Sequence, residues 1–351
     1  MAENSIKKSK WLTYNLGQIS ECRDVFFGLS AIFLAVFHSR LMTIGRPELA
    51  FLDRFIKLVQ DYGNLGVDIF LILSGIGLYY SFSKNSNIRE FYKRRAVRVL
   101  PPLFIVTAIY YSITMKSGTV VDYIKNVTTL SFFTDGDWAF WYFSIIIILY
   151  ALYPFIHKLI DRYRIFGLAL LVVLSIGFYC YVFLKHRDWF DNWEIGILRT
   201  PMFFFGCWLG KLVKEGKKLP TPLVVGVSGA LIAGVCVFNH YFAALIEEHY
   251  FIERVVFWPL AIGMVFLCSA ILPLIPIPRI KKILSFFGFY SFEIYLLFNR
   301  LPKEIAQKIF YVDKGLVCYY FAMFVATVFV AILLKSACDS ITKFLLAQKK
   351  K

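Results

Sequence analysis

Residues 25–40, VFFGLSAIFLAVFHSR, place a histidine at the end of an uncharged run. The residues from Val25 to Phe37 carry no charge, which is typical of a helix inside a lipid bilayer. A charged side chain at membrane depth costs about 2.5–3.5 kcal/mol on insertion scales, so ionisable residues retained there are candidates for function. The stretch therefore predicts a membrane helix that carries His38 as a candidate functional residue.

The composition of the whole chain extends this prediction. Of its 351 residues, 59% are hydrophobic and 18% are charged, with 37 Phe. This composition indicates an integral membrane protein. The net charge of +16 comes from residues scattered between apolar segments, so we expect contact with the lipid bilayer and no nucleic-acid partner. The seven Cys form no CxxC pair, which favours neither a disulfide framework nor a metal site.

Apolar segments of membrane-spanning length recur along the chain, which predicts an all-α polytopic membrane helix bundle with about ten transmembrane helices. We place these helices at 25–43, 63–81, 99–114, 139–157, 164–184, 196–213, 222–238, 253–274, 284–300 and 314–337.

Lys and Arg are concentrated in alternate loops, most densely between residues 84 and 98. Because cytoplasmic loops carry an excess of these residues, we expect a multi-pass protein of the plasma membrane with both termini in the cytoplasm. The histidines other than His38, His157 among them, fall at predicted helix ends or in loops, where solvation is ordinary.

Three ionisable residues fall at membrane depth, His38, Asp68 and Glu293, with Lys335 near an inner helix end. His38 and Asp68 lie towards the outer ends of consecutive antiparallel helices, so they could meet, and Asn64 lies one turn before Asp68 on the same face. A carboxylate that accepts from one imidazole nitrogen fixes the tautomer and leaves the other nitrogen as a base towards a hydroxyl.

Each of these residues also has a purely structural interpretation. His38 could only hydrogen-bond a neighbouring helix, and Asp68 could cap the N-terminus of its own helix. Glu293 likewise has a functional and a purely structural interpretation. Arg199 is also typical of an interfacial anchor, and Trp141 of an aromatic belt at the membrane surface.

A basic segment between the second and third predicted helices admits two interpretations. Arg94 and Arg98 lie one turn apart, and Arg95 lies between them, at the predicted cytoplasmic surface. The positive-inside rule accounts for their charge. Alternatively, they form a clamp for the phosphates of an anionic cytosolic donor, since the Arg fork matches phosphate geometry.

Several segments together resemble the acyltransferase-3 family of multi-pass membrane acyltransferases. The segments are GLSAIFLAVFH (28–38), GVDIFLILSGIGLYYS (66–81), FYKRRAVRVLPP (91–102), WYFSIIIILYALYP (141–154), FFFGCWLG (203–210) and FGFYSFEIYLL (287–297). Two positions depart from the family pattern. Phe27 stands where members commonly have a basic residue eleven positions before the histidine, and Phe298 stands where a histidine is common.

The resemblance implies an O-acyltransferase that moves an acyl group, often acetyl, from acetyl-CoA or another acyl-CoA to a hydroxyl. The acceptor would be a cell-surface carbohydrate or a lipid-linked envelope precursor. It also implies one transmembrane acyltransferase-like domain over 23–338, between a cytoplasmic tail at 1–22 and a basic cytoplasmic tail at 339–351.

Within this resemblance His38 is the expected base and Asp68 the group that orients it. The expected donor-binding residues are Arg94, Arg95 and Arg98. The expected substrate-binding residues are Asn64, Trp141, Arg199 and Glu293. A transporter or flippase for a surface polysaccharide or its precursor is the alternative, with His38 and Asp68 as proton-coupling groups.

Overall fold

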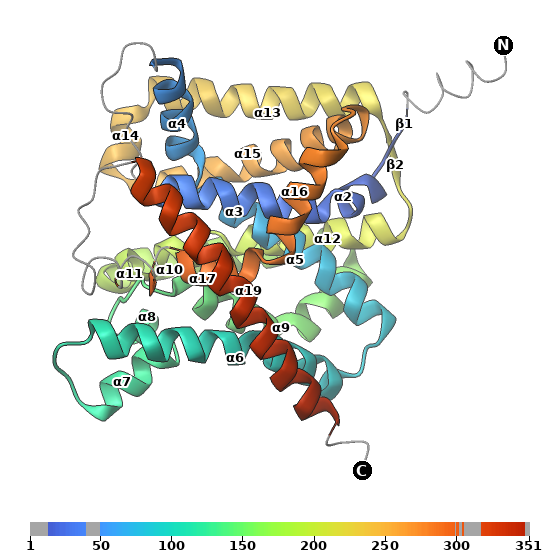
Figure 1. The fold of residues 1–351 in the computed structure, drawn as a ribbon. Helices are drawn as coiled ribbons and strands as arrows, with labels where there is room; N and C mark the ends of the chain where they lie inside the picture. The colour runs from blue at the N-terminus through green and yellow to red at the C-terminus, as the bar shows by residue number, and fades with distance from the viewer. Residues whose placement is uncertain (1–12, 40–49, 299, 302–303, 305–316, 348–351) are drawn as a thin grey trace. The chain divides into compact units, whose positions relative to one another are not determined.

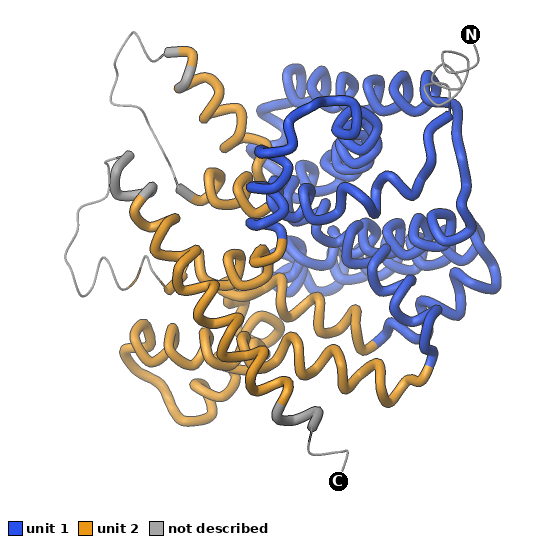
Figure 2. Tube along the Cα trace, turned by 45° about the vertical axis from the view of Figure 1, so that its right-hand side comes forward, with its two compact units in different colours: residues 1–30, 65–86, 152–288 blue, residues 31–64, 87–151, 289–351 orange. Residues whose placement is uncertain are grey.

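The computed structural model describes residues 13–39, 50–298, 300–301, 304 and 317–347. Nearly all elements in these ranges are helices, which confirms the predicted all-α class. Two short strands, β1 (Thr13–Asn15) and β2 (Lys218–Pro220), pair antiparallel. The chain divides into two compact units, shown in Figure 2: unit 1 comprises residues 1–30, 65–86 and 152–288, and unit 2 comprises residues 31–64, 87–151 and 289–351.

Unit 1 contains more of the long apolar helices than unit 2 does, and Figure 1 labels the elements of both units. Its elements are β1, α2 (Gly17–Glu21), the first part of α3 (Arg23–Ser39), α5 (Leu65–Lys84), the second part of α9 (Trp141–Tyr163), α10 (Ile165–Lys185), α11 (Arg187–Ile197), α12 (Thr200–Lys214), β2, α13 (Thr221–Tyr241), α14 (Ala243–Glu248), α15 (Tyr250–Ile271), the 3-10 helix η2 (Leu272–Leu274) and most of α16 (Pro278–Phe289).

Unit 2 takes the remaining parts of α3 and α9 and adds helices from both halves of the chain. These are α4 (Ala50–Tyr62), α6 (Ile88–Thr114), α7 (Val120–Val127), α8 (Ser131–Thr134), α17 (Ser291–Phe298) and α19 (Val317–Ala347). The predicted single domain over 23–338 stays a prediction. Of the two predicted tails, residues 1–12 and 348–351 lie outside the described residues.

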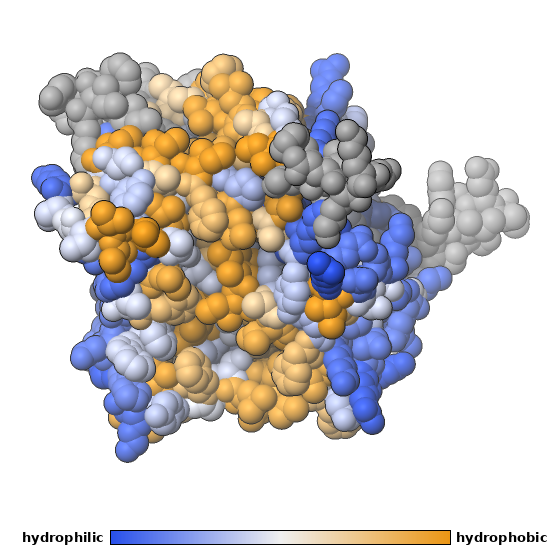
Figure 3. Space-filling model, turned by 90° about the horizontal axis from the view of Figure 1, so that it is seen from below, coloured by the Kyte–Doolittle hydropathy of each residue, from blue (hydrophilic) through white to orange (hydrophobic). Residues whose placement is uncertain are grey.

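Seven helices in the described ranges are long and apolar enough to span a membrane: α5, α6, α9, α10, α13, α15 and α19. Hydrophobic residues also cover much of the face drawn in Figure 3. The chain is thus a multi-pass membrane protein, but the predicted count of about ten is not confirmed. The other three predicted spans fall on shorter elements: α3 has 17 residues, α12 has 15, and the ninth segment is divided into α16 and α17. A helix of 15 residues covers about 22 Å of the ~30 Å hydrocarbon core.

Glycines bring α5 and α12 into backbone contact. A Cβ added at Gly206 would lie 2.2 Å from the Ile72 carbonyl oxygen, and one added at Gly75 would lie 2.5 Å from that of Phe203. Only a residue without a side chain permits this approach. Gly210, one turn after Gly206, approaches Ile76, one turn after Ile72, so α5 and α12 run parallel through unit 1.

Helix α6 corrects the prediction that residues 84–98 form a basic loop. The helix begins at Ile88, where the Glu90 backbone N–H donates to Asn87 Oδ1 at 3.0 Å and caps the first turn. Arg and Lys are good helix formers, so the positive charge does not stop the helix. Arg94, Arg95 and Arg98 therefore lie on a helix and not in a loop.

Two prolines, Pro101 and Pro102, lie inside α6, although the sequence predicts a helix that begins near them. A proline has no N–H to donate, so Pro101 leaves the Val97 carbonyl without its usual helical partner. The Thr342 hydroxyl of α19 donates to that carbonyl at 3.5 Å. This side-chain donor helps α6 to continue through the prolines.

Candidate active site

A small pocket in unit 2 contains His38 and Trp141, which the sequence singles out separately. His38 lies in the last turn of α3, Trp141 is the first residue of α9, and Tyr295 comes from α17. Arg300, just beyond α17, completes one side. The volume of this cavity, called here the His38 pocket, is about 30 Å³, which is room for one or two water-sized groups.

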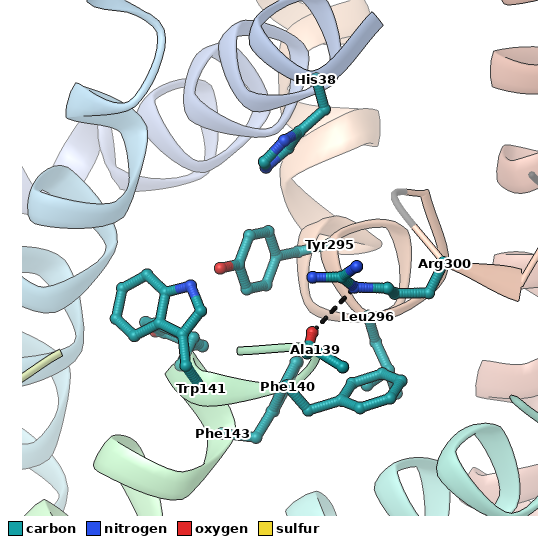
Figure 4. A pocket seen from close by; sticks show the side chains of 9 residues that line it. His38, Ala139, Phe140, Trp141, Phe143, Tyr295, Leu296 and Arg300 are labelled. Atoms are coloured by element: carbon teal, nitrogen blue, oxygen red, sulfur yellow. Dashed lines mark hydrogen bonds between the residues drawn. The ribbon is translucent and has the colours of Figure 1, made fainter. Parts of the chain in front are cut away.

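Aromatic packing and one cation fix the walls of the His38 pocket. The Tyr142 ring packs edge-on against the Tyr295 ring, with centroids 5.1 Å apart. Arg300 donates from Nε to the Ala139 carbonyl at 2.9 Å and from Nη2 to the Trp138 carbonyl at 3.3 Å, which ties it to the segment before α9. In Figure 4 the His38 ring and the Arg300 guanidinium point into one space beside Tyr295.

This arrangement combines two groups that acyl transfer to a hydroxyl can use. A neutral imidazole can take a proton from a hydroxyl at physiological pH. A guanidinium at the same cavity can stabilise negative charge on oxygen. The sequence analysis does not single out Arg300. Its signal is a cation at the outer end of the predicted span 284–300, which also carries Glu293.

Glu293 does not line the His38 pocket. Lys335 of α19 pairs with it, with Nζ 3.6 Å from Oε1, and both side chains are largely buried. A buried carboxylate without a cation is strongly destabilising, so the pair gives Glu293 a structural role. Its assignment to substrate binding stays a prediction.

In unit 1 the structure brings together Asp68 and Arg199, to which the sequence assigns separate roles. Arg199 Nη1 donates to Asp68 Oδ2, and both side chains are fully buried. Arg199 immediately precedes α12, and Asp68 lies in the first turn of α5. Because α5 begins at Leu65, the cap interpretation of Asp68 is wrong: an N-cap precedes its helix.

A second buried ion pair lies close enough to the first for their charges to interact. Arg254 of α15 contacts Glu194 of α11, with Nη2 3.0 Å from Oε1. Burial raises the pKa of Glu194 above its ordinary range, and the Arg254 charge opposes this effect. Glu253 Oε2 also lies 3.7 Å from Arg254 Nη1, so the group holds three carboxylates and two guanidiniums.

Whether Asp68 orients His38 stays a prediction, because the two residues belong to different units. Asp68 Oδ1 has no hydrogen-bond partner among the described residues. Asn64 directly precedes α5 and belongs to unit 2, so its predicted role beside Asp68 also stays a prediction.

The predicted donor-binding arginines make local contacts in unit 2. Arg94 Nη1 lies 2.5 Å from Glu90 Oε1, one helical turn away. The Arg95 guanidinium lies over the Phe91 ring, 5.7 Å from its centroid. Arg98 is close enough to Glu293 for their charges to interact. Their role towards phosphate stays a prediction.

The two departures from the family pattern are packed by aromatic and cationic neighbours. The Arg23 guanidinium lies over the Phe27 ring, 5.0 Å from its centroid, and the Phe70 ring is 5.5 Å away. Arg23 therefore places a cation beside the position where a basic residue is common. Phe298 packs against Phe324, with ring centroids 5.9 Å apart.

A scan against protein-family models matches the acyltransferase-3 family, described as an acyltransferase domain, over residues 22–336. Searches of curated proteins and of solved structures found no match. Within the described residues, no cluster of His, Cys, Asp and Glu has the arrangement of a metal site.

Proposed function

The chain belongs to the acyltransferase-3 family, and on that premise we propose that it is a membrane O-acyltransferase for the cell envelope. It would move an acyl group, acetyl in the simplest case, from acyl-CoA to a hydroxyl of a cell-surface carbohydrate or a lipid-linked precursor. The observation that supports this proposal is the His38 pocket, where an imidazole, a guanidinium and aromatic rings converge.

In the proposed reaction His38 removes the proton from the acceptor hydroxyl as its oxygen attacks the carbonyl carbon of the thioester. Arg300 would stabilise the negative charge that develops on the carbonyl oxygen. A cavity of about 30 Å³ holds a hydroxyl and not a sugar ring, so the rest of the acceptor would lie outside against Trp141 or Tyr295. Arg94, Arg95 and Arg98 would hold the donor phosphates.

We also propose that the chain lies in the plasma membrane with both termini in the cytoplasm. The basic ends of α9 and α12 meet in unit 1. Lys211 Nζ lies 2.8 Å from Asp161 Oδ1, and Arg164 Nη2 lies 3.5 Å from Glu215 Oε1. Because α5 runs parallel to α12, Lys84 lies at the same end. Basic residues gathered at one end of a helix group favour the cytoplasmic side for that end.

Labelled acetyl-CoA tests the proposal with purified protein in liposomes and an envelope carbohydrate fraction as acceptor. We expect label on the carbohydrate, and a loss of about 100-fold or more for His38→Ala, the range for removal of a general base. His240→Ala is the matched control, because this exposed histidine lies at the end of α13. We expect its activity to equal that of the wild type.

Two results would contradict the proposal. Label transfer that persists unchanged in His38→Ala removes this residue from catalysis. Wild-type protein that consumes no thioester, but moves a carbohydrate precursor across the liposome membrane with protons, supports the transporter alternative.

A further inference from the structure

A serine and a histidine face each other in unit 1, at the end of α5 remote from Asp68. Ser83 Oγ and His157 Nε2 are 3.2 Å apart, and both side chains are half-buried. A hydroxyl within hydrogen-bond reach of an imidazole is the arrangement of an activated nucleophile and its base. His157 was predicted to be ordinarily solvated at a helix end, and that prediction is wrong.

Three aromatic rings pack around the His157 imidazole. The Tyr79 ring stacks on it with centroids 4.9 Å apart and planes 26° from parallel, and the Phe82 ring lies 4.8 Å away. The Tyr153 ring is 6.0 Å away. This packing holds the imidazole with Nε2 towards Ser83.

A polar network fixes Tyr79 in turn. The Tyr79 hydroxyl donates to Asp161 Oδ1 at 2.8 Å, and Lys211 Nζ donates to the same oxygen at 2.8 Å. Lys214 lies over the Tyr79 ring, with Nζ 6.0 Å from the centroid. The site therefore has a positioned base and two cations nearby, which suits a donor that carries phosphate groups.

We propose that Ser83 is an acyl-accepting nucleophile that His157 activates, and that it takes the acyl group from the acyl-CoA thioester before transfer to the acceptor. This inference rests on the proposed acyl-CoA donor. It assigns the cytoplasmic end of unit 1 a first half-reaction, separate from the hydroxyl chemistry at the His38 pocket.

The half-reaction balances without a further co-reactant. Ser83 Oγ attacks the carbonyl carbon of the thioester while its proton passes to His157 Nε2. The C–S bond then breaks, and the CoA thiolate takes the proton from His157 and leaves as the thiol. The products are an ester on Ser83 and CoA. The acceptor hydroxyl then attacks this ester in place of the thioester, and its proton passes to Ser83 Oγ, which regenerates the serine.

The test is a single-turnover experiment with the full-length protein and labelled acetyl-CoA, without acceptor. After an acid quench we expect protein-bound label that hydroxylamine releases, and peptide mass spectrometry should find one acetyl group on Ser83. Ser83→Ala should lose the label, and His157→Gln should slow its appearance by about 100-fold. Ser81→Ala is the matched control on the same helix and should label like the wild type.

The outcomes separate this inference from the proposed function. Wild-type protein that acetylates the carbohydrate without ever carrying label, or Ser83→Ala protein that transfers as fast as the wild type, overturns the role of Ser83 and leaves the proposed function intact. Label on Ser83 without any transfer to carbohydrate supports the inference and contradicts the proposed acceptor. Wild-type protein that neither carries label nor releases CoA overturns both.

Discussion

The two ends of α5 in unit 1 differ in how exposed the nearby carboxylates are. At one end Asp68 and Arg199 are fully buried. At the other end, about 22 Å away for 15 residues of helix, the Asp161 side chain that binds Lys211 is 54% exposed. Buried charges must be compensated within the protein, whereas exposed ones are solvated. The Asp68 end therefore serves the stability of the fold, while the Ser83 end can admit a charged reactant.

The largest effect should come from removal of one partner at the buried end. Arg199→Met leaves the Asp68 carboxylate without its cation, and we expect the free energy of unfolding to fall by about 3–5 kcal/mol. Denaturant unfolding in detergent micelles measures the change.

The double variant Asp68→Leu/Arg199→Met is the control for this prediction. It removes both charges, so we expect it to recover most of the lost stability. A double variant as unstable as the single one would show that packing, and not the uncompensated charge, holds this end together.

A smaller effect should follow from a change between the two ends, one helical turn from Asp68. Gly206→Ala forces a methyl group against the Ile72 carbonyl, and overpacking of this kind costs about 1–3 kcal/mol. The same unfolding experiment measures it. Gly229→Ala on α13 is the matched control, because nothing lies within 4 Å of its added Cβ, and we expect a gain of about 0.5–1 kcal/mol. Equal effects at the two glycines would contradict the close contact of α5 and α12.

The smallest effect should come from the Ser83 end, where Lys211 is largely buried but its partner Asp161 is exposed. Lys211→Met keeps the packing of the side-chain stem and removes the ion pair with Asp161, whose carboxylate remains solvated. We expect a loss of about 1 kcal/mol or less by the same measurement. A loss as large as that of Arg199→Met would remove the distinction between the two ends.

Local patterns in the sequence predict much of the fold. The helices at 164–184 and 222–238 are predicted within a few residues of α10 and α13, because hydropathy reports burial in lipid residue by residue. The start of α6 is missed because a search for apolar segments ignores caps, although Asn87 followed by Glu90 is a cap pattern.

The sequence identifies single candidate residues more readily than it identifies which residues lie together. His38 and Trp141 are singled out by residue type, but helical periodicity gives the face of a residue and not the distant residue it meets. Asp68 and Arg199 are 131 positions apart, and Ser83 and His157 are 74 apart. Such pairs depend on how helices pack, which no single helix encodes.

The glycine contact between α5 and α12 limits how a small group could travel along unit 1. At Gly206 the two backbones touch so closely that not even a methyl group fits between them. Water or an acetyl group therefore cannot pass between the two helices at this contact. Any conduit that links the two membrane surfaces must follow another flank of these helices.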